Sequence, residues 1–560
     1  MKSWMSRRRF LNAASSVCAS FVSPSRRISS LFNPEREIAL SGEHLAAVRR
    51  HRRIIAHDDP NNFDPHELLG MNFDQWVAYR FNYADQHGSQ IDGFCWDIAF
   101  GGNQAVYKSR LLRSVQIPGL QKWRDQGIDP VEGLIQACRK RKLEAFWNHR
   151  VNEVDREANG GGLQMMAIEP VKKMHPDWLI RSWWWQGFWN YAVEDARNYR
   201  LQILKELASN YEFDGIQLDF SRHVPCLPPG HQWELRKGVT EYVRQARLLL
   251  LSLEKKRGRP YLLLAKVPET LAGCHIDGFD VEVWARDGLV DVLVLGDRSI
   301  DVDLSGFRRV ISGTSVMLQP CLDDHHATDG YKFPPTEFFR AVFSNWWAQG
   351  ADSVMTFNWS CAPPEVAKSI GSEPGPISHQ EAYRCVGSTE TLKFKNKLFV
   401  VQRRGGYPWA EGYFNRNDVA QLPVELANEG TPISLTLDIR DEFAFEKVKQ
   451  VSLSLVMFGA YDGDAFQVTL NGFVLKDPSQ DFKWKDPQIY SPKLQPPSGR
   501  NVYRVDPGQR LMKLTFNPPP EQFREGTNVV KVHIAGRQSY PATETIHIEK
   551  LEVALQYVGT

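Results

Sequence analysis

Short apolar runs alternate with amphipathic stretches between about residue 52 and residue 357. A run of four to eight apolar residues bounded by polar residues predicts a buried strand, whereas apolar residues that recur every three or four positions predict a helix. The runs that predict strands are 53–56, 91–96, 144–147, 213–220, 261–265, 290–295, 315–318 and 353–357. Stretches that predict helices lie at 73–86, from 129 onward, and at 191–210, 232–256, 281–288 and 336–349. Eight strand–helix units over about 310 residues predict an α/β fold, the (β/α)8 TIM barrel.

A second pattern begins beyond about residue 390, where apolar and polar residues alternate at every position. Ile433 to Ile439 and Val451 to Leu455 follow it, and Asn471-Gly472 is a strong hairpin turn signal. This period predicts strands that are buried on one face only. We therefore expect a TIM-barrel catalytic domain over residues 50–390 and an antiparallel, jelly-roll-like β-sandwich over residues 391–560. The sandwich is either an accessory carbohydrate-binding module or a structural cap on the barrel.

The charge of the chain argues against a nucleic-acid partner. The formal net charge of the 560 residues is +2, but residues 1–32 hold six basic residues and no acidic one. The remainder therefore has 62 basic against 66 acidic residues, a net charge of −4. A nucleic-acid-binding chain is expected to be basic.

Residues 1–32 resemble a bacterial twin-arginine signal peptide. Ser6-Arg7-Arg8-Arg9-Phe10-Leu11 carries the paired arginines, and a weakly apolar stretch follows. The resemblance implies export in the folded state, to the periplasm or the medium; the alternative is a disordered basic tail. Of the eight cysteines, Cys18 lies in this segment and seven lie between residues 95 and 385 without close spacing, which predicts free thiols and no zinc site. No segment offers 18 consecutive apolar residues, so we expect no membrane span.

Polar and charged residues follow the predicted strands on their carboxyl side. In a TIM barrel this face carries the chemistry, because the loops after all eight strands converge there. The fourth strand delivers Asp219, Arg222 and His223. The other strand ends deliver Asp58, Trp96, Asp97, Asn148, His149, Arg150, Lys266, Glu269, Asp297, Gln319, Asn358 and Trp359. We predict that these residues surround one pocket.

Four segments together carry a family resemblance: Phe-Trp-Asn-His-Arg-Val-Asn at 146–152, Lys-Met-His-Pro-Asp-Trp-Leu at 173–179, the fourth strand with Arg222-His223, and Gly-Phe-Asp-Val-Glu-Val-Trp at 278–284. They resemble the bacterial glycoside-hydrolase-like TIM-barrel proteins, a glycosyl hydrolase-like family related to the family-10-like hydrolases, over roughly residues 50–390. In that family the fourth strand usually reads Asp-Gly-Ile-Glu-Leu-Asp-Phe. Here Gln217 replaces the Glu, so either that Glu is not catalytic or this chain has lost or changed the activity.

The same strand is similar to the Asp-Gly-Phe-Arg-Leu-Asp strand of α-amylase-like enzymes, in which the last Asp is the nucleophile. That resemblance implies that Asp219 attacks the anomeric carbon. A second carboxyl group is needed to protonate the departing oxygen. The amylase-like arrangement implies Glu269, and an α-galactosidase-like arrangement implies Asp297; we favour Glu269.

The remaining strand-end residues are predicted to bind substrate. Three cations, Arg150, Arg222 and Lys266, hint at a carboxylated or sulfated polysaccharide. The alternative is that they neutralise nearby carboxylates: Asp58, Asp59, Asp97 and Asp219. Trp96, Trp359 or the triplet Trp183-Trp184-Trp185 can stack on a sugar ring, and the three adjacent tryptophans cannot all face one core. The run Asp323-Asp324-His325-His326 does not have the spacing of a metal site, so we predict neither metal nor cofactor.

Two functions of different classes fit this sequence. The first is an exported glycoside hydrolase that cleaves a poly- or oligosaccharide by a two-carboxylate mechanism. The second is a non-catalytic polysaccharide-binding barrel in which Gln217 marks a decayed site. An enzyme requires a second carboxylate within about 10 Å of Asp219, whereas a binding protein requires exposed aromatic rings instead.

Overall fold

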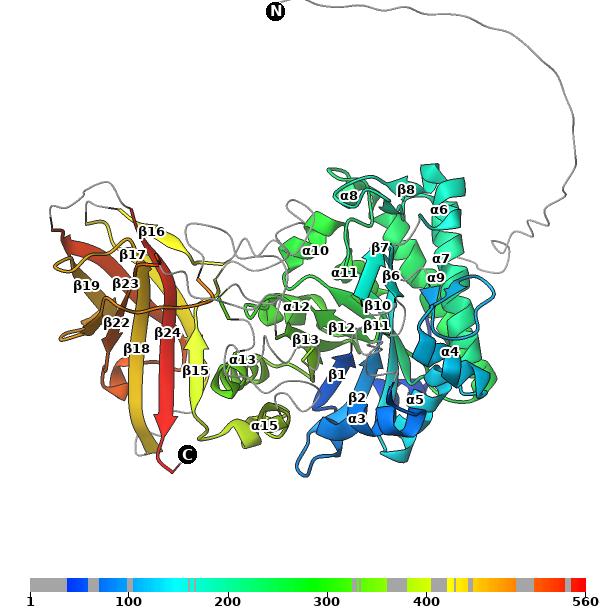
Figure 1. Ribbon diagram of the computed structural model, residues 1–560, viewed down its shortest axis with the longest axis horizontal. Helices are drawn as coiled ribbons and strands as arrows, with labels where there is room; N and C mark the ends of the chain where they lie inside the picture. Colours follow the sequence, from blue (N-terminus) through cyan, green and yellow to red (C-terminus); the bar gives the residue numbers. More distant parts are fainter. Residues whose placement is uncertain are drawn as a thin grey trace, which may run out of the picture. The chain divides into compact units, whose positions relative to one another are not determined.

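The computed structural model describes most of the chain from residue 38 onward (Figure 1). The described residues are 38–58, 70–97, 104–159, 162–165, 168–324, 330–331, 334–359, 380–403, 420–427, 430–441, 447–489, 508–538 and 545–559. The twin-arginine segment, Asp59, His325 and His326 lie outside them.

Eight parallel strands close into a barrel in which spatial order follows chain order. Their bounds are β1 (Ile54–Asp58), β2 (Ile91–Trp96), β5 (Glu144–Arg150), β10 (Gly215–Asp219), β11 (Leu262–Val267), β12 (Val292–Leu295), β13 (Met317–Asp323) and β14 (Val354–Phe357). Nearly every strand residue is buried, because the inner face packs on the barrel interior and the outer face on helices. The predicted TIM barrel is confirmed, and β1, β5, β11 and β13 continue beyond the predicted strand ends.

Helices surround these strands (Figure 1). They are α3 (Phe73–Asp85), α4 (Pro118–Asp125), α5 (Pro130–Lys140), α7 (Glu194–Asn210), α8 (Gln232–Leu235), α9 (Lys237–Arg257), α10 (Leu271–Asp277), α11 (Val281–Arg286), α12 (Leu304–Val310) and α13 (Thr336–Ala348), followed by α15 (Gln380–Tyr383) and α16 (Thr389–Leu392). Local sequence explains where they begin. At α5, for example, the Asp129 carboxylate accepts hydrogen bonds from the Val131 and Glu132 backbone N–H groups, and Pro130 occupies the first helical position.

Short elements extend from the carboxyl ends of β2 and β5. Those after β2 are β3 (Gln104–Ala105) and β4 (Arg113–Ser114). Those after β5 are β6 (Arg156–Asn159), β7 (Gly162–Met165), α6 (Pro170–Met174), a 3-10 turn η4 (Pro176–Trp178), β8 (Leu179–Ile180) and β9 (Phe188–Trp189). The tryptophan triplet lies between β8 and β9.

The amino end of the barrel is closed by α1 (Gly42–Val48), whose Val48 joins the apolar core inside the strands. On the same helix His44 is fully buried between two carboxylates. Its Nδ1 lies 2.7 Å from Glu254 Oε2 and its Nε2 lies 2.9 Å from Asp291 Oδ1. Burial by itself lowers the pKa of His44, but the hydrogen bond and charge of Asp291 outweigh it, so the pKa is raised.

Two antiparallel sheets form the C-terminal part of the chain. One has the order β15-β24-β18-β22-β21, with β16 also paired to β24, and the other has the order β17-β23-β19-β20. The bounds are β15 (Lys397–Val400), β16 (Val424–Leu426), β17 (Ile433–Ile439), β18 (Val448–Phe458), β19 (Ala465–Leu470), β20 (Phe473–Val474), β21 (Ser479–Asp481), β22 (Leu511–Phe516), a 3-10 turn η7 (Pro520–Gln522), β23 (Gly526–Gly536) and β24 (Ile546–Tyr557). Side chains of both sheets, such as Leu437 and Leu453, share one core. This is the predicted β-sandwich.

Candidate active site

The inner face of the barrel becomes polar toward the carboxyl ends of the strands. Successive side chains on a strand point to opposite faces, so residues two positions beyond the apolar inner core face the same way. Ile55, Cys95, Phe146, Leu264 and Cys321 belong to that core. Continuing the alternation brings these polar residues to the inner face: His57, Asp97, Asn148, Arg150, Lys266 and Asp323. On β10, Gln217 and Asp219 pair in register with Asn148 and Arg150 and so share their face.

Asn148 joins two carboxylates at the centre of this group. Its Nδ2 donates hydrogen bonds to Asp97 Oδ2 at 2.9 Å and to Asp219 Oδ2 at 3.0 Å. Because one nitrogen contacts both oxygens, these oxygens are at most about 6 Å apart. All three residues are buried. The structure therefore brings a second carboxylate, Asp97, close to Asp219.

Gln217 fixes the orientation of Asn148. Its Nε2 donates a 2.6 Å hydrogen bond to Asn148 Oδ1, and Gln217 is fully buried. The Asn148 NH2 group must face the two carboxylates, since only N–H groups can donate to them, so its oxygen needs a donor on the other side. A carboxylate at position 217 has no proton to offer when it is ionised. Gln217 thus holds the Asn148 side chain in the orientation that faces both carboxylates.

Asp219 accepts two further hydrogen bonds from the chain that follows it. Its Oδ1 accepts the Ser221 N–H at 3.1 Å and the Arg222 N–H at 3.0 Å. These bonds form because the chain turns sharply at the end of β10, as in an Asx turn. The carboxylate of Asp219 is therefore held in one orientation by three donors.

Arg150 links Asp97 to a carboxylate that sequence reasoning missed. Arg150 donates through Nε to Asp97 and through a terminal nitrogen to Glu153, just beyond β5. Glu153 also pairs with His223, at 2.9 Å. Burial alone raises the pKa of Glu153, but Arg150 and His223 outweigh it and hold the pKa well below its ordinary value. The sequence could have indicated Glu153, because it lies three residues after Arg150 in the loop that follows β5 at the mouth.

Lys266 and Asp297 form a second buried ion pair. Lys266 Nζ lies 2.8 Å from Asp297 Oδ2, and Arg298 lies 3.1 Å from Asp297 Oδ1. Burial lowers the pKa of Lys266, but the charge of Asp297 outweighs it, so the pKa is raised. Each Asp297 oxygen is therefore paired with a cation.

Glu269 lies just beyond β11, next to the end of β12. A Cβ atom on Gly296 would lie 2.2 Å from Glu269 Cγ, and Gly296 has a positive φ of 66°, so only glycine fits there. Glu269 Oε1 accepts a long, 3.4 Å hydrogen bond from the Arg298 N–H. Burial raises the pKa of Glu269 to about 7, and the charge of Asp297 acts in the same direction. A carboxyl group with this pKa is protonated in a large fraction of molecules at neutral pH.

Four residues predicted at the mouth lie instead on the outer side of the strands or among the helices. Asp58 accepts hydrogen bonds from Arg80 and Tyr83 of α3. The other three are also buried in this layer: Trp96 stacks on Phe94, His149 lies near Arg200 of α7, and Trp359 packs on Phe339 of α13. The expectation that these side chains face the pocket is wrong. Asp58, Trp96 and His149 each lie one position from an inward-facing residue and so point outward, and Trp359 packs on α13.

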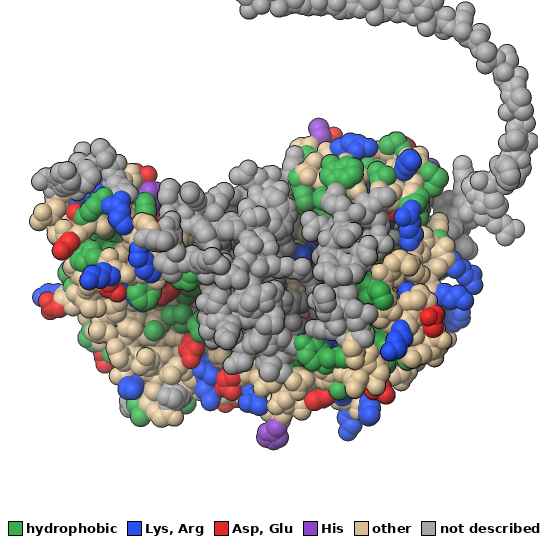
Figure 2. Space-filling view, viewed as in Figure 1, with side chains coloured by type: hydrophobic (Ala, Val, Ile, Leu, Met, Phe, Trp, Pro, Cys, Tyr) green, Lys and Arg blue, Asp and Glu red, His purple; other side chains and the backbone are tan. Residues whose placement is uncertain are grey.

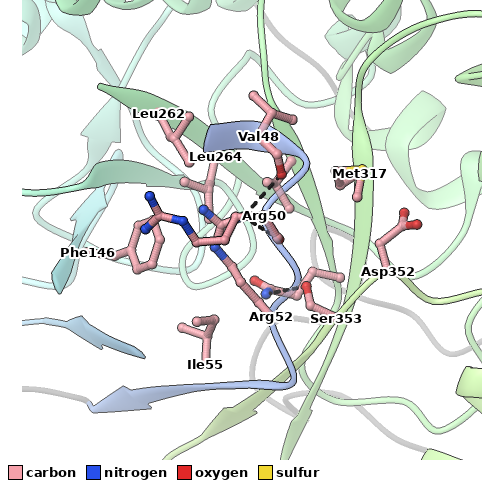
Figure 3. A pocket seen from close by; sticks show the side chains of 12 residues that line it. Val48, Arg50, Arg52, Ile55, Phe146, Leu262, Leu264, Met317, Asp352 and Ser353 are labelled. Carbon is pink, nitrogen blue, oxygen red and sulfur yellow. Dashed lines mark hydrogen bonds between the residues drawn. The ribbon is translucent and has the colours of Figure 1, made fainter. Parts of the chain in front are cut away.

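Gln319 lies near the opposite end of the barrel. It lines a small internal cavity with Val48, Arg52, Phe146 and Ser353, and its Nε2 donates to Ser353 Oγ at 2.7 Å (Figure 3). The predicted seventh strand ended at 318, but β13 continues to Asp323, so Asp323 takes the place at the mouth that we assigned to Gln319.

Asn358 follows β14 directly. It is buried and has a left-handed backbone, with φ of 60°. Its assignment as a substrate-binding residue stays a prediction, as do those of Arg222 and His223.

The three adjacent tryptophans differ in burial, as expected from their positions in the sequence. Trp184 is buried, Trp183 is half-buried and donates to the Val224 carbonyl, and Trp185 is 60% exposed. Of the three, Trp185 is the most exposed.

The described residues contain no group of three or more His, Cys, Asp or Glu side chains arranged to hold a metal ion. The six cysteines described are buried free thiols. Within the same part of the chain, no helix has the length and apolar character needed to cross a membrane. On the face shown in Figure 2, basic and acidic side chains are both present on the described surface.

No protein-family model matches the chain, and no curated protein matches it. Similar solved structures include the PgaB (BpsB) glycoside hydrolase domain from Bordetella bronchiseptica, at 12% identity and a TM-score of 0.39, covering 60% of this chain and 99% of that one. Alpha-L-fucosidase isoenzyme 2 from Paenibacillus thiaminolyticus has 13% identity and a TM-score of 0.35, covering 67% and 51%.

A GH36 alpha-galactosidase from Geobacillus stearothermophilus has 12% identity and a TM-score of 0.33, and covers 84% of this chain. The chain spans 56% of the length of that enzyme and 57% of the length of a Paenibacillus cycloisomaltooligosaccharide glucanotransferase.

Proposed function

We propose that this protein is an exported glycoside hydrolase that cleaves a poly- or oligosaccharide with Asp219 as its nucleophile or base. The observation that carries the proposal is the pair Asp97 and Asp219, held at most about 6 Å apart by Asn148 at the carboxyl end of the barrel. Buried carboxylates are costly unless they are paired or functional. Two of them at this face can stabilise the positive charge that develops on the sugar during glycoside cleavage.

In this mechanism Asp219 acts on the anomeric carbon, either directly or through water. Three hydrogen bonds hold its carboxylate, so little reorganisation is needed when charge develops on the sugar. Asp97, which pairs with Arg150, lies beside Asp219 and adds a second carboxylate.

We assign the general acid to Glu269. Its pKa of about 7 keeps it protonated in a large fraction of molecules at neutral pH, and a general acid works best with a pKa near the working pH. Asp297, the alternative, has both of its oxygens occupied by ion pairs with Lys266 and Arg298.

The first experiment is a screen of the purified mature chain against polysaccharides, with detection of new reducing ends. On a substrate found in this way, E269Q should lose about 10²–10⁴-fold in turnover. The loss should be smaller on aryl glycosides whose leaving group needs no proton. If D297N or D97N shows that leaving-group dependence and E269Q does not, the acid is misassigned. A chain that binds polysaccharide but releases no reducing ends would be a binding protein.

Export is the second part of the proposal, and it rests on Arg7 and Arg8. Residues 1–35 fused to a folded reporter should carry it across the inner membrane, and changing both arginines to lysine should stop it. Export that survives this change would show a different route.

A further inference from the structure

The cations at the inner mouth are neutralised by carboxylates of the same site. Arg150 pairs with Asp97 and Glu153, and Lys266 and Arg298 both pair with Asp297. Arg222 lies 5.8 Å from the centre of the Phe357 ring, and its charge contributes to lowering the pKa of Glu153. Asp219 and Asp323 add further negative charge to the same group. A carboxylated or sulfated sugar would therefore enter a site whose positive charges are already engaged.

His57 is a polar side chain at this face whose ring nitrogens make no hydrogen bond to any described residue. It is 1% exposed and packs on Phe357, with 4.5 Å between ring centroids. Neither of its ring nitrogens has a hydrogen-bond partner among the described residues, and neither has Gln217 Oε1. Buried polar atoms are nearly always hydrogen-bonded, so these atoms point to a ligand.

His57 is uncharged in this environment. Burial lowers its pKa well below the ordinary value, and the positive charges of Lys266, Arg150 and Arg222 add to that effect. A neutral imidazole offers one N–H donor and one nitrogen acceptor. That is the pattern that a sugar hydroxyl, itself both donor and acceptor, complements.

We propose that the sugar unit bound beside Asp97 and Asp219 is a neutral pyranose, without carboxylate or sulfate, and that His57 hydrogen-bonds one of its hydroxyl groups. This inference rests on the proposed function, since it names the substrate class of the same site. Under this proposal Arg150 and Lys266 neutralise carboxylates of the site and do not bind an anionic sugar.

The test of substrate class is a binding measurement on the D219N chain, which keeps the shape of the site. The probes are matched oligosaccharide pairs that differ only at C6, hexose against the corresponding uronic acid, and neutral oligosaccharides against their sulfated forms. A neutral member should bind at least about 10-fold more tightly than its charged counterpart. Tighter binding of the charged members, or binding of neither, would overturn the proposal. If the protein binds neutral oligosaccharides but the wild type does not cleave them, the result would instead contradict the proposed hydrolase activity.

The test of His57 compares H57F, H57Q and H149A in the same assay. Phe keeps the ring that packs on Phe357 but has no nitrogen, so H57F should weaken binding of the neutral probe about 10-fold or more. Gln keeps a donor and an acceptor, so H57Q should retain more binding than H57F. His149 is another buried histidine, on the outer face of β5, and H149A should leave the affinity of the folded protein unchanged. Equal affinities for H57F and wild type would overturn the role of His57.

Discussion

The raised pKa of Glu269 makes a quantitative prediction about stability. In the unfolded chain this carboxyl group ionises near pH 4.5, whereas in the folded chain it ionises near pH 7. Between these values the folded state binds the extra proton, so folding stability falls as the pH rises. The E269Q variant has no such proton to lose. From pH 5 to pH 8 the free energy of unfolding of the wild type should fall by about 2.5 kcal/mol relative to E269Q.

Tryptophan fluorescence during urea unfolding measures this difference. Fourteen of the 17 tryptophans lie between residues 76 and 359, so the signal reports mainly on the barrel. The wild type and E269Q are compared at pH 5, 6, 7 and 8, with E282Q, a change at an exposed glutamate, as the matched control. Should the wild type and E269Q follow parallel curves from pH 5 to pH 8, Glu269 titrates normally and is not suited to be the acid.

Two further predictions concern buried polar networks. Q217E places a carboxyl group against Asn148 Oδ1, so the Asn148 oxygen loses its hydrogen-bond donor. We expect the free energy of unfolding to fall by about 1–3 kcal/mol and turnover to fall as well. Unchanged turnover would show that Gln217 does not position Asn148. The raised pKa of His44 means that its ion pairs with Asp291 and Glu254 stabilise the fold fully below about pH 6.5 and that this stability is lost as the pH rises through the raised pKa. The stability difference between wild type and H44Q should therefore shrink from pH 6 to pH 9, and a constant difference would contradict the assignment.

The sequence was sufficient to predict the architecture, because eight apolar runs separated by amphipathic helices leave few alternatives to a barrel. Asp219 was also predictable, since an aspartate at the end of a buried strand needs a partner or a function. The sequence did not show whether each strand-end side chain points into the barrel or out of it. Both faces of a parallel barrel strand are apolar, so the pattern does not show which face is inner.

This ambiguity explains the errors at β1 and β13. On β1 the inward residue is His57, and its neighbour Asp58 faces α3. On β13 the apolar run ends early in the sequence while the strand continues to Asp323, so Gln319 lies mid-strand. The contacts of Asn148 with Asp97, Asp219 and Gln217 join three strands, and strand register, which sets such contacts, was not available from the chain alone.

The most direct test of the account is the turnover of D219N on a confirmed polysaccharide substrate, measured together with its affinity for that substrate. Asparagine keeps the shape but only one of the two acceptor oxygens, so either Asn148 or the Ser221 and Arg222 N–H groups lose their acceptor. It also removes the charge that stabilises the transition state. The account predicts a fall in turnover of several orders of magnitude, with a dissociation constant that changes little. Turnover that stays within about tenfold of the wild type, a change of only about 1.4 kcal/mol in the barrier, would contradict it.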